Sequence, residues 1–121
     1  MYFEKIVKNN ILIVEVISES PLITNVQSAL DILMKAKYDF GTDNIIIDKK
    51  LITEDFFILS TGLAGEILQK FINYGGRIAI YGDYSHYTSK PLKDFIYESN
   101  KGKDVFLFPQ KKKYLMFLCG N

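Results

Sequence analysis

The sequence contains little of what is typical of secreted or metal-binding proteins. Its 121 residues include one cysteine, Cys119, and one histidine, His86. A single cysteine cannot form an internal disulfide, so we expect a reduced, cytoplasmic protein in which Cys119 has no special role. One histidine with no cysteine nearby cannot make a standard zinc site. We therefore expect neither a structural metal nor a cofactor.

An excess of one charge and long apolar runs are also missing. The 15 Lys and Arg residues nearly balance the 14 Asp and Glu residues, for a net charge of +1, whereas nucleic-acid-binding domains display a strongly basic face. Apolar runs such as residues 11–14 have the length of a strand and cannot cross a bilayer. The first residues lack a basic segment followed by an apolar one, which argues against a signal peptide. We expect no nucleic acid and no membrane among the partners.

Apolar and aromatic residues are abundant. They make up 48% of the chain and include nine Phe and eight Tyr, which is enough for a core without disulfide or metal support. Residues 2–7 and 11–17 are rich in β-forming residues and are joined at Asn9 and Asn10, a residue type that tolerates the positive φ of a tight turn. In the second segment nearly every residue except Glu15 is apolar, which indicates that both of its faces are covered. An N-terminal hairpin is predicted.

Helical and strand-like patterns alternate after this hairpin. An apolar stripe that begins after Thr24 or Asn25 predicts a helix to about residue 38, ended by Gly41. Strands are predicted at 44–48, 77–82 and 104–108, with helices after residue 62, from Ser89 to Gly102, and over 111–118. The predicted order is β-β-α-β-α-β-α-β-α. Alternation of this kind implies an α/β fold with a mostly parallel central sheet.

Residues around the second predicted helix carry a resemblance to a known fold. A strand ending at Asp48, the run Ser60-Thr61-Gly62-Leu63 at a helix start, and a strand closing on Gly82 resemble the STAS fold. Domains with this fold occur in bacterial anti-sigma-factor antagonists and in the tails of sulfate transporters. The resemblance covers most of the chain in element order and residues 44–82 in detail. It implies one STAS-like α/β domain over residues 1–121 and a regulatory, protein-binding function.

Two longer runs, residues 61–71 and 87–102, are similar to a second family, the bacterial domain of unknown function 4180. This similarity extends over nearly the whole chain. It implies no activity, because the function of that family is unknown. The two resemblances together predict an uncharacterised binding or regulatory module with a STAS-like fold.

The STAS resemblance also implies a regulatory site at the start of the second helix. In STAS antagonists a kinase phosphorylates the hydroxyl residue directly before the helix-start glycine, which by position is Thr61, with Ser60 as its neighbour and Gly62 as the glycine. The free N–H groups of a helix start stabilise an anion such as a phosphate. The family has an Asp before the two hydroxyl residues, where this chain has Leu59. The alternative interpretation is an ordinary helix N-cap.

The loop of residues 82–90 is the second candidate site, because ligands favour the carboxyl edge of a parallel sheet. Its polar residues and those after the preceding strand form a candidate pocket: Asp48, Lys49, Asp83, Ser85, His86 and Lys90. In one interpretation His86 is a general base oriented by Asp83 or Asp48. In the other, His86 is an exposed loop residue among tyrosines. A third interpretation is a magnesium site at Asp48 and Asp83, because such a site needs only two carboxylate ligands from the protein.

The last segment combines three lysines, residues 111–113, with the apolar residues 114–118. It is predicted to be a packed helix with a solvated face, or a surface that contacts a second subunit. Three hypotheses on function follow. The first is a regulatory module that binds a protein partner or a small anion through Thr61 and the 83–90 loop. The second is a small hydrolase or transferase using Asp48, Asp83 and His86, and the third is a structural homodimer.

Overall fold

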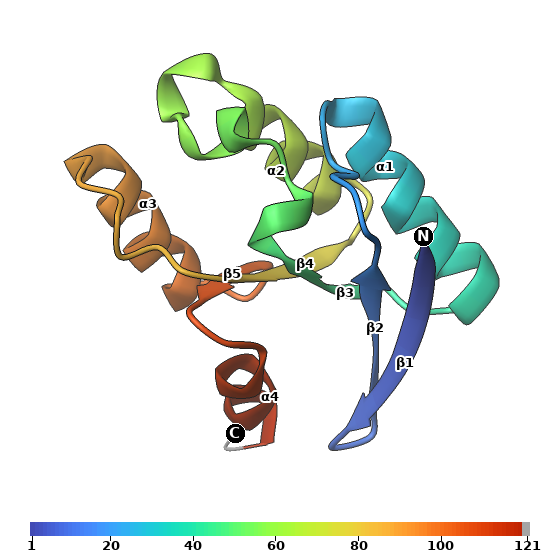
Figure 1. Cartoon of the computed structure of the whole chain (residues 1–121). Helices are drawn as coiled ribbons and strands as arrows, with labels where there is room; N and C mark the ends of the chain where they lie inside the picture. Colours follow the sequence, from blue (N-terminus) through green and yellow to red (C-terminus); the bar gives the residue numbers. More distant parts are fainter. Residues whose placement is uncertain (120–121) are drawn as a thin grey trace.

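A five-stranded sheet forms the middle of the molecule, as the computed structural model in Figure 1 shows. The structure describes the backbone of residues 1–119 and the side chains of residues 1–117. The strands are β1 (Tyr2–Lys8), β2 (Ile11–Ile17), β3 (Asn44–Asp48), β4 (Arg77–Tyr81) and β5 (Val105–Phe108). They lie in the sheet in chain order, with β1 antiparallel to β2 and the other pairs parallel. The predicted fold class, a mostly parallel sheet with an N-terminal hairpin, is confirmed.

The hairpin turn is the one that its two asparagines predict. Asn9 and Asn10 have φ values of 54° and 64°. Positive φ at both central residues matches the right-handed twist of the flanking strands, and asparagine adopts it at low cost. The turn therefore fixes the register, in which Tyr2 lies opposite Ile17 and Lys8 opposite Ile11.

Within residues 1–119, four α-helices cover the sheet, three of them on one face. They are α1 (Val26–Lys35), α2 (Leu63–Asn73), α3 (Lys90–Lys101) and α4 (Lys111–Cys119). Each of α1, α2 and α3 connects two parallel neighbours in a sheet whose strands follow chain order. Right-handed crossovers that all advance in one direction place their helices on the same face. The last helix, α4, follows β5 and covers the opposite face (Figure 1).

The sheet thus separates two apolar cores of unequal size. The larger core lies between the sheet and the three helices and includes Val14, Leu33, Ile67 and Phe71, all nearly inaccessible to solvent. The smaller one lies under α4. Its buried members are Ile13, Ile46, Ala79, Phe106 and Tyr114. The predicted coverage of both faces of β2 is confirmed.

The helices α1 and α3 begin at the predicted capping residues, and α1 changes helix type before it ends. Asn25 caps α1 by accepting a hydrogen bond from the Ser28 N–H, and Ser89 caps α3 by accepting one from the Leu92 N–H. The first helix does not stay α-helical to residue 38. It continues as a π-helical turn, Ala36–Phe40, and ends at Gly41 with a φ of 66°.

Within residues 1–119, no helix combines the length and the apolar content needed to cross a bilayer. The single-domain organisation and the cytoplasmic location stay predictions. The prediction for Cys119 falls on a side chain outside the described ones.

Candidate functional site

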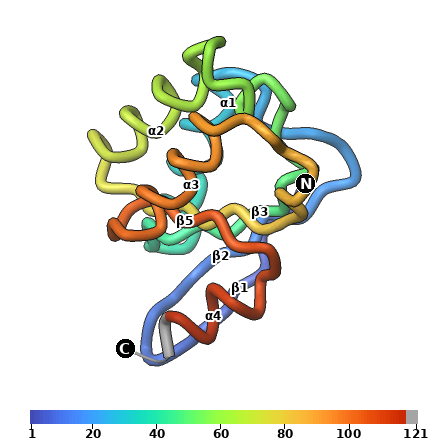
Figure 2. The backbone as a smooth tube through the Cα atoms, turned by 90° about the vertical axis from the view of Figure 1, so that its left-hand side faces the viewer, coloured from blue at the N-terminus to red at the C-terminus, as the bar shows by residue number. Residues whose placement is uncertain are grey.

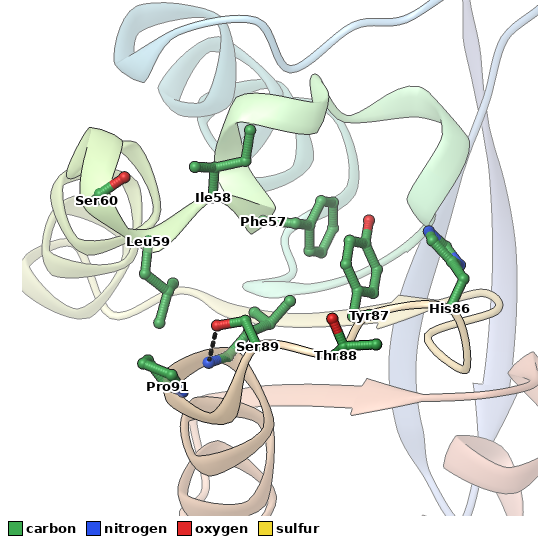
Figure 3. Close-up of a pocket in the computed structure, with 10 residues that line it drawn as sticks. Phe57, Ile58, Leu59, Ser60, His86, Tyr87, Thr88, Ser89 and Pro91 are labelled. Atoms are coloured by element: carbon green, nitrogen blue, oxygen red, sulfur yellow. Dashed lines mark hydrogen bonds between the residues drawn. The ribbon is translucent and has the colours of Figure 1, made fainter.

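The candidate site lies at the carboxyl edge of the sheet, where two connections meet. After β3 the chain forms three short 3-10 turns, η2 (Lys49–Leu51), η3 (Glu54–Phe57) and η4 (Leu59–Thr61), before α2 begins. After β4 it forms the loop of residues 82–89, which leads into α3. Figure 3 shows the two connections facing each other across a cavity.

This cavity, the edge cavity, has a volume of about 410 Å³. Its lining residues are Phe57, Ile58, Leu59, Ser60, His86, Tyr87, Thr88, Ser89, Pro91 and Leu92. Figure 3 shows Leu59 pointing from η4 toward Pro91 and Ser89 at the start of α3. The lining is mostly apolar, with hydroxyl groups among it, which is the composition of a surface that holds an apolar side chain and orients it by hydrogen bonds. The predicted proximity of the Ser60 turn to the 83–90 loop is confirmed.

The helix start at Ser60, Thr61 and Gly62 is built differently from the predicted N-cap. Neither Ser60 nor Thr61 is the N-cap, because both belong to the 3-10 turn η4. Gly62 occupies the N-cap position of α2 with a left-handed φ of 79°, a conformation in which a β-carbon is strained. The glycine is therefore needed to turn the chain from η4 into α2.

The two hydroxyl groups in this turn have different surroundings. Thr61 Oγ1 lies within hydrogen-bond distance of the carbonyl oxygens of Asp55 (2.8 Å) and Ile58 (2.9 Å) and accepts a bond from the Leu63 N–H. It ties η3 to the start of α2. Ser60 is exposed, lines the edge cavity and makes no side-chain hydrogen bond within the described part of the chain. Ser60 is therefore the hydroxyl that a second molecule can reach without opening the turn.

A charged and aromatic cluster lies beside the edge cavity, and its two rings, Phe57 and Tyr87, line the cavity. The rings of Phe57 and Tyr87 stack with their centres 5.7 Å apart, and Lys49 Nζ lies beside both, 4.8 Å from the first ring centre and 4.9 Å from the second. It also lies 3.6 Å from Glu54 Oε1. The Tyr87 hydroxyl donates a 2.6 Å hydrogen bond to Glu54 Oε2. Burial, together with this bond, raises the pKa of Tyr87 above its usual value. The cluster holds the 82–89 loop against η3.

Close packing between Gly82 and Lys49 makes this cluster possible. A β-carbon at residue 82 would lie 2.6 Å from the Lys49 β-carbon, so only glycine fits. Phe57, Tyr87 and Gly82 were not among the predicted pocket residues. Their sequence signal is weak, because aromatic residues and glycines are common in core and turn positions alike.

The predicted acid–base group is not assembled. Asp83 accepts hydrogen bonds from the Ser85 N–H (2.8 Å) and the Ser85 hydroxyl (2.5 Å), and these bonds lower the pKa of Asp83. Asp48 accepts from the Lys50 N–H. His86 stacks on Tyr87, with ring centres 4.2 Å apart, and within residues 1–119 no hydrogen bond joins it to either carboxylate. Each side chain has its own local partner, since Asp residues bond readily to N–H groups two residues ahead.

The charges of the predicted pocket are also paired locally. Lys90 forms a 2.7 Å ion pair with Asp94 one turn along α3, and Lys49 is near Glu54. An anion in the cavity would compete with these carboxylates. Among the described residues, no group of three or more His, Cys, Asp or Glu side chains is placed to hold a metal ion.

Comparison with known proteins gives a family and one structural likeness. A search of curated protein sequences gives no significant match. The chain is similar to the 1.59 Å crystal structure of a candidate anti-sigma factor antagonist from Thermotoga maritima, at 14% identity and a TM-score of 0.46, over 98% of this chain and 95% of that one. A family model, the domain of unknown function 4180, matches residues 8–117. The chain belongs to this family.

Proposed function

We propose that this chain is a non-catalytic binding module that holds a protein partner at the edge cavity. The single observation that carries the proposal is the joint lining of this cavity by η4 and the start of α3. Ile58, at the cavity, leaves 47% of its side chain exposed. Exposed apolar residues grouped around a cavity are a common feature of surfaces that bind other proteins.

Ser60 is the residue through which binding at this cavity is regulated. Its hydroxyl is exposed and lines the cavity, whereas the Thr61 hydroxyl is occupied within the turn. A phosphate on Ser60 would add nearly two negative charges beside a mostly apolar surface. Such a group would weaken the binding of an apolar partner segment while leaving the fold intact. The alternative occupant, a small anion, would meet lysines that already have carboxylate partners.

The proposal is tested by affinity capture from the native cells with the wild type and three variants. Ile58→Asp and Ser60→Glu place a charge at the cavity, and each is expected to lose the protein that the wild type captures. Tyr38→Asp is the matched control, because Tyr38 is 86% exposed and lies in the π-helical turn, outside the cavity lining. A partner retained equally by all forms would exclude the edge cavity as its binding surface. Mass spectrometry of the native protein would show whether Ser60 or Thr61 is phosphorylated.

The predicted homodimer is a separate proposal that uses another surface. Met116 and Phe117 on α4 leave 60% and 40% of their side chains exposed. Light scattering would detect the dimer directly, and Met116→Lys would be expected to disrupt it.

A further inference from the structure

A second cavity opens along the seam between α2 and α3. This seam cavity has a volume of about 380 Å³. Its apolar lining comes from Leu68, Ile72, Phe95 and Val105. The helix α2 packs closely on α1 but makes little contact with α3. Figure 1 shows α3 set apart from the α1–α2 pair, and Figure 2 shows α4 on the other side of the sheet from these three helices. The edge cavity lies at the N-terminal ends of α2 and α3, so the two cavities lie along one open seam.

Both helices line the seam cavity with a regular stripe. On α2 the lining residues are Gly65, Leu68, Gln69 and Ile72, and on α3 they are Phe95, Glu98 and Ser99, followed by the C-cap residue Gly102. Each set has the spacing i, i+3, i+4, i+7, which is the spacing by which a helix presents one face to another helix. The two faces line one cavity but do not close on each other. The seam is therefore a surface on which a third helix could pack against α2 and α3 together.

Gly65 is an independent sign that another chain approaches α2 here. It lies inside a helix without the left-handed backbone that requires glycine, and a β-carbon there would have no atom within 4 Å. Neither the backbone nor neighbouring atoms explain a glycine at this position, and glycine is the least favourable helix residue after proline. A residue without a side chain leaves the helix backbone open to close approach. Small residues have this role where two helices pack tightly.

The charges at the two ends of the seam give the bound helix a direction. Since α2 and α3 both follow parallel strands, their N-termini lie together at the carboxyl edge and carry partial positive charge, while their C-termini carry partial negative charge. Glu98 and Asp104 line the C-terminal end together with Lys103. Within the described residues the Asp104 carboxylate has no hydrogen bond or ion pair. A helix running antiparallel to α2 and α3 places its positive N-terminus beside Asp104.

We propose that the α2–α3 seam is the docking groove for an amphipathic helix of a partner protein, running antiparallel to α2 and α3. This inference rests on the proposed function, because the helix in the groove belongs to the same partner protein that binds at the edge cavity. A helix of about three turns matches the 11 residues of α2. Its apolar residues at i, i+3 or i+4, and i+7 would fill the seam against Leu68 and Phe95.

The test uses peptides rather than an unidentified partner. Two display libraries of 14-residue peptides are selected on the immobilised full chain: one of helix-forming residues, the other with a proline at every fourth position. Binders are expected from the first library only, with apolar residues at the stated spacing and an increase in helical circular dichroism on binding. Binders from the second library only, or none from either, would overturn the proposal, because the groove would then take an extended segment or no peptide.

The Gly65→Ala variant distinguishes an effect on peptide binding from an effect on the stability of the fold. The added methyl group has open space, so it is expected to raise Tm by a few degrees, yet to weaken a selected peptide by about tenfold. Lys70→Ala, on α2 outside the seam lining, is the matched control and should change affinity less than about twofold. Ile72→Asp, at a side chain 48% exposed, should abolish binding without unfolding the protein. Equal affinity of wild type and Gly65→Ala would contradict the proposal.

Ile58→Asp distinguishes failure of this inference from failure of the proposed function. Peptides that lose affinity with Gly65→Ala but not with Ile58→Asp would support the groove and exclude the edge cavity. Peptides that respond only to Ile58→Asp would leave the edge cavity as a binding surface and overturn the groove.

Discussion

Lys111 Nζ lies 2.8 Å from Oε1 of Glu15, a carboxylate that is only 3% exposed. This ion pair joins the first residue of α4 to the middle of β2. The Tyr81 hydroxyl donates a 2.6 Å hydrogen bond to the other oxygen of Glu15. Each oxygen of the buried carboxylate therefore has one partner, and the polar group is accommodated beside the smaller core.

Removing the cation of this pair should loosen the attachment of α4. Lys111→Met leaves the buried charge of Glu15 with one partner, and we expect a loss of about 1–3 kcal/mol in the free energy of unfolding. Lys112→Met, at the next residue, is the control and should change stability by less than about 0.5 kcal/mol. Urea denaturation measures both variants.

A second change shows whether the lost stability comes from the unpaired charge. Glu15→Gln in the Lys111→Met background removes the charge and keeps an acceptor for Tyr81, so part of the lost stability should return. Equal losses in the single and double variants would contradict this explanation.

Stability should fall at alkaline pH because of buried tyrosines. Burial raises the pKa of Tyr81, Tyr84, Tyr87 and Tyr114, with added contributions from Glu15 at Tyr81 and from Glu54 at Tyr87. An unfolded tyrosine titrates near pH 10. Because the folded-state pKa values are higher, the unfolded state loses its protons first as the pH rises. The stabilisation is complete below about pH 10 and is lost as the pH rises toward the folded-state values.

The measurement is urea denaturation from about pH 8 to pH 11. Each raised tyrosine contributes at most about 1.4 kcal/mol per pH unit in this range. Tyr84→Phe removes one of these groups and should make the decline less steep, although it also removes the hydrogen bond to the Ile80 carbonyl. An identical slope in wild type and Tyr84→Phe would show that burial of Tyr84 does not cause the decline.

Gly82 should tolerate no side chain. In Gly82→Ala the new β-carbon meets the Lys49 β-carbon at 2.6 Å, and neither can move without moving backbone. We expect a loss of about 2 kcal/mol and a changed near-ultraviolet circular dichroism signal, because Lys49 is displaced from its place beside the stacked rings of Phe57 and Tyr87. Gly102→Ala is the matched control, since its nearest contact would be 3.4 Å. Equal stabilities of the two variants would contradict the close-packing explanation.

Local sequence patterns predicted the parts of this fold that local physics determines. Asn9 and Asn10 indicated the hairpin turn, and Ser89 marked a helix start, because turn and capping preferences act over a few residues. The partners of Glu15 could not be predicted in this way. Tyr81 and Lys111 lie 66 and 96 residues away in the chain and meet the carboxylate only when β4 and α4 are in place.

Element order predicted which connections lie close together but not how their side chains pair, for the same reason. The connections after β3 and β4 line one cavity at the carboxyl edge of the sheet, whereas the use of Ser60 as a binding or regulatory site stays a prediction. The alternative interpretation of the Ser60-Thr61-Gly62 run as an ordinary N-cap is wrong for Thr61, since Gly62 occupies the N-cap position of α2. The Thr61 hydroxyl bonds instead to the Asp55 carbonyl, six residues back, in a turn that no short pattern specifies. The position of Lys49 beside the rings of Phe57 and Tyr87 likewise depends on the loop after β4, which supplies Tyr87.

Substitution of Thr61 should lower stability more than substitution of Ser60, although the two residues are neighbours. Thr61→Val keeps the shape but removes the hydroxyl that ties Asp55 to Leu63, and it should cost about 1 kcal/mol of stability. Ser60→Ala removes an exposed hydroxyl and should change stability by less than about 0.5 kcal/mol. Thermal denaturation of Thr61→Glu and Ser60→Glu extends the comparison. Only Thr61→Glu should lower Tm, since its larger side chain cannot replace those bonds, and equal shifts would show that the two hydroxyl groups have the same role.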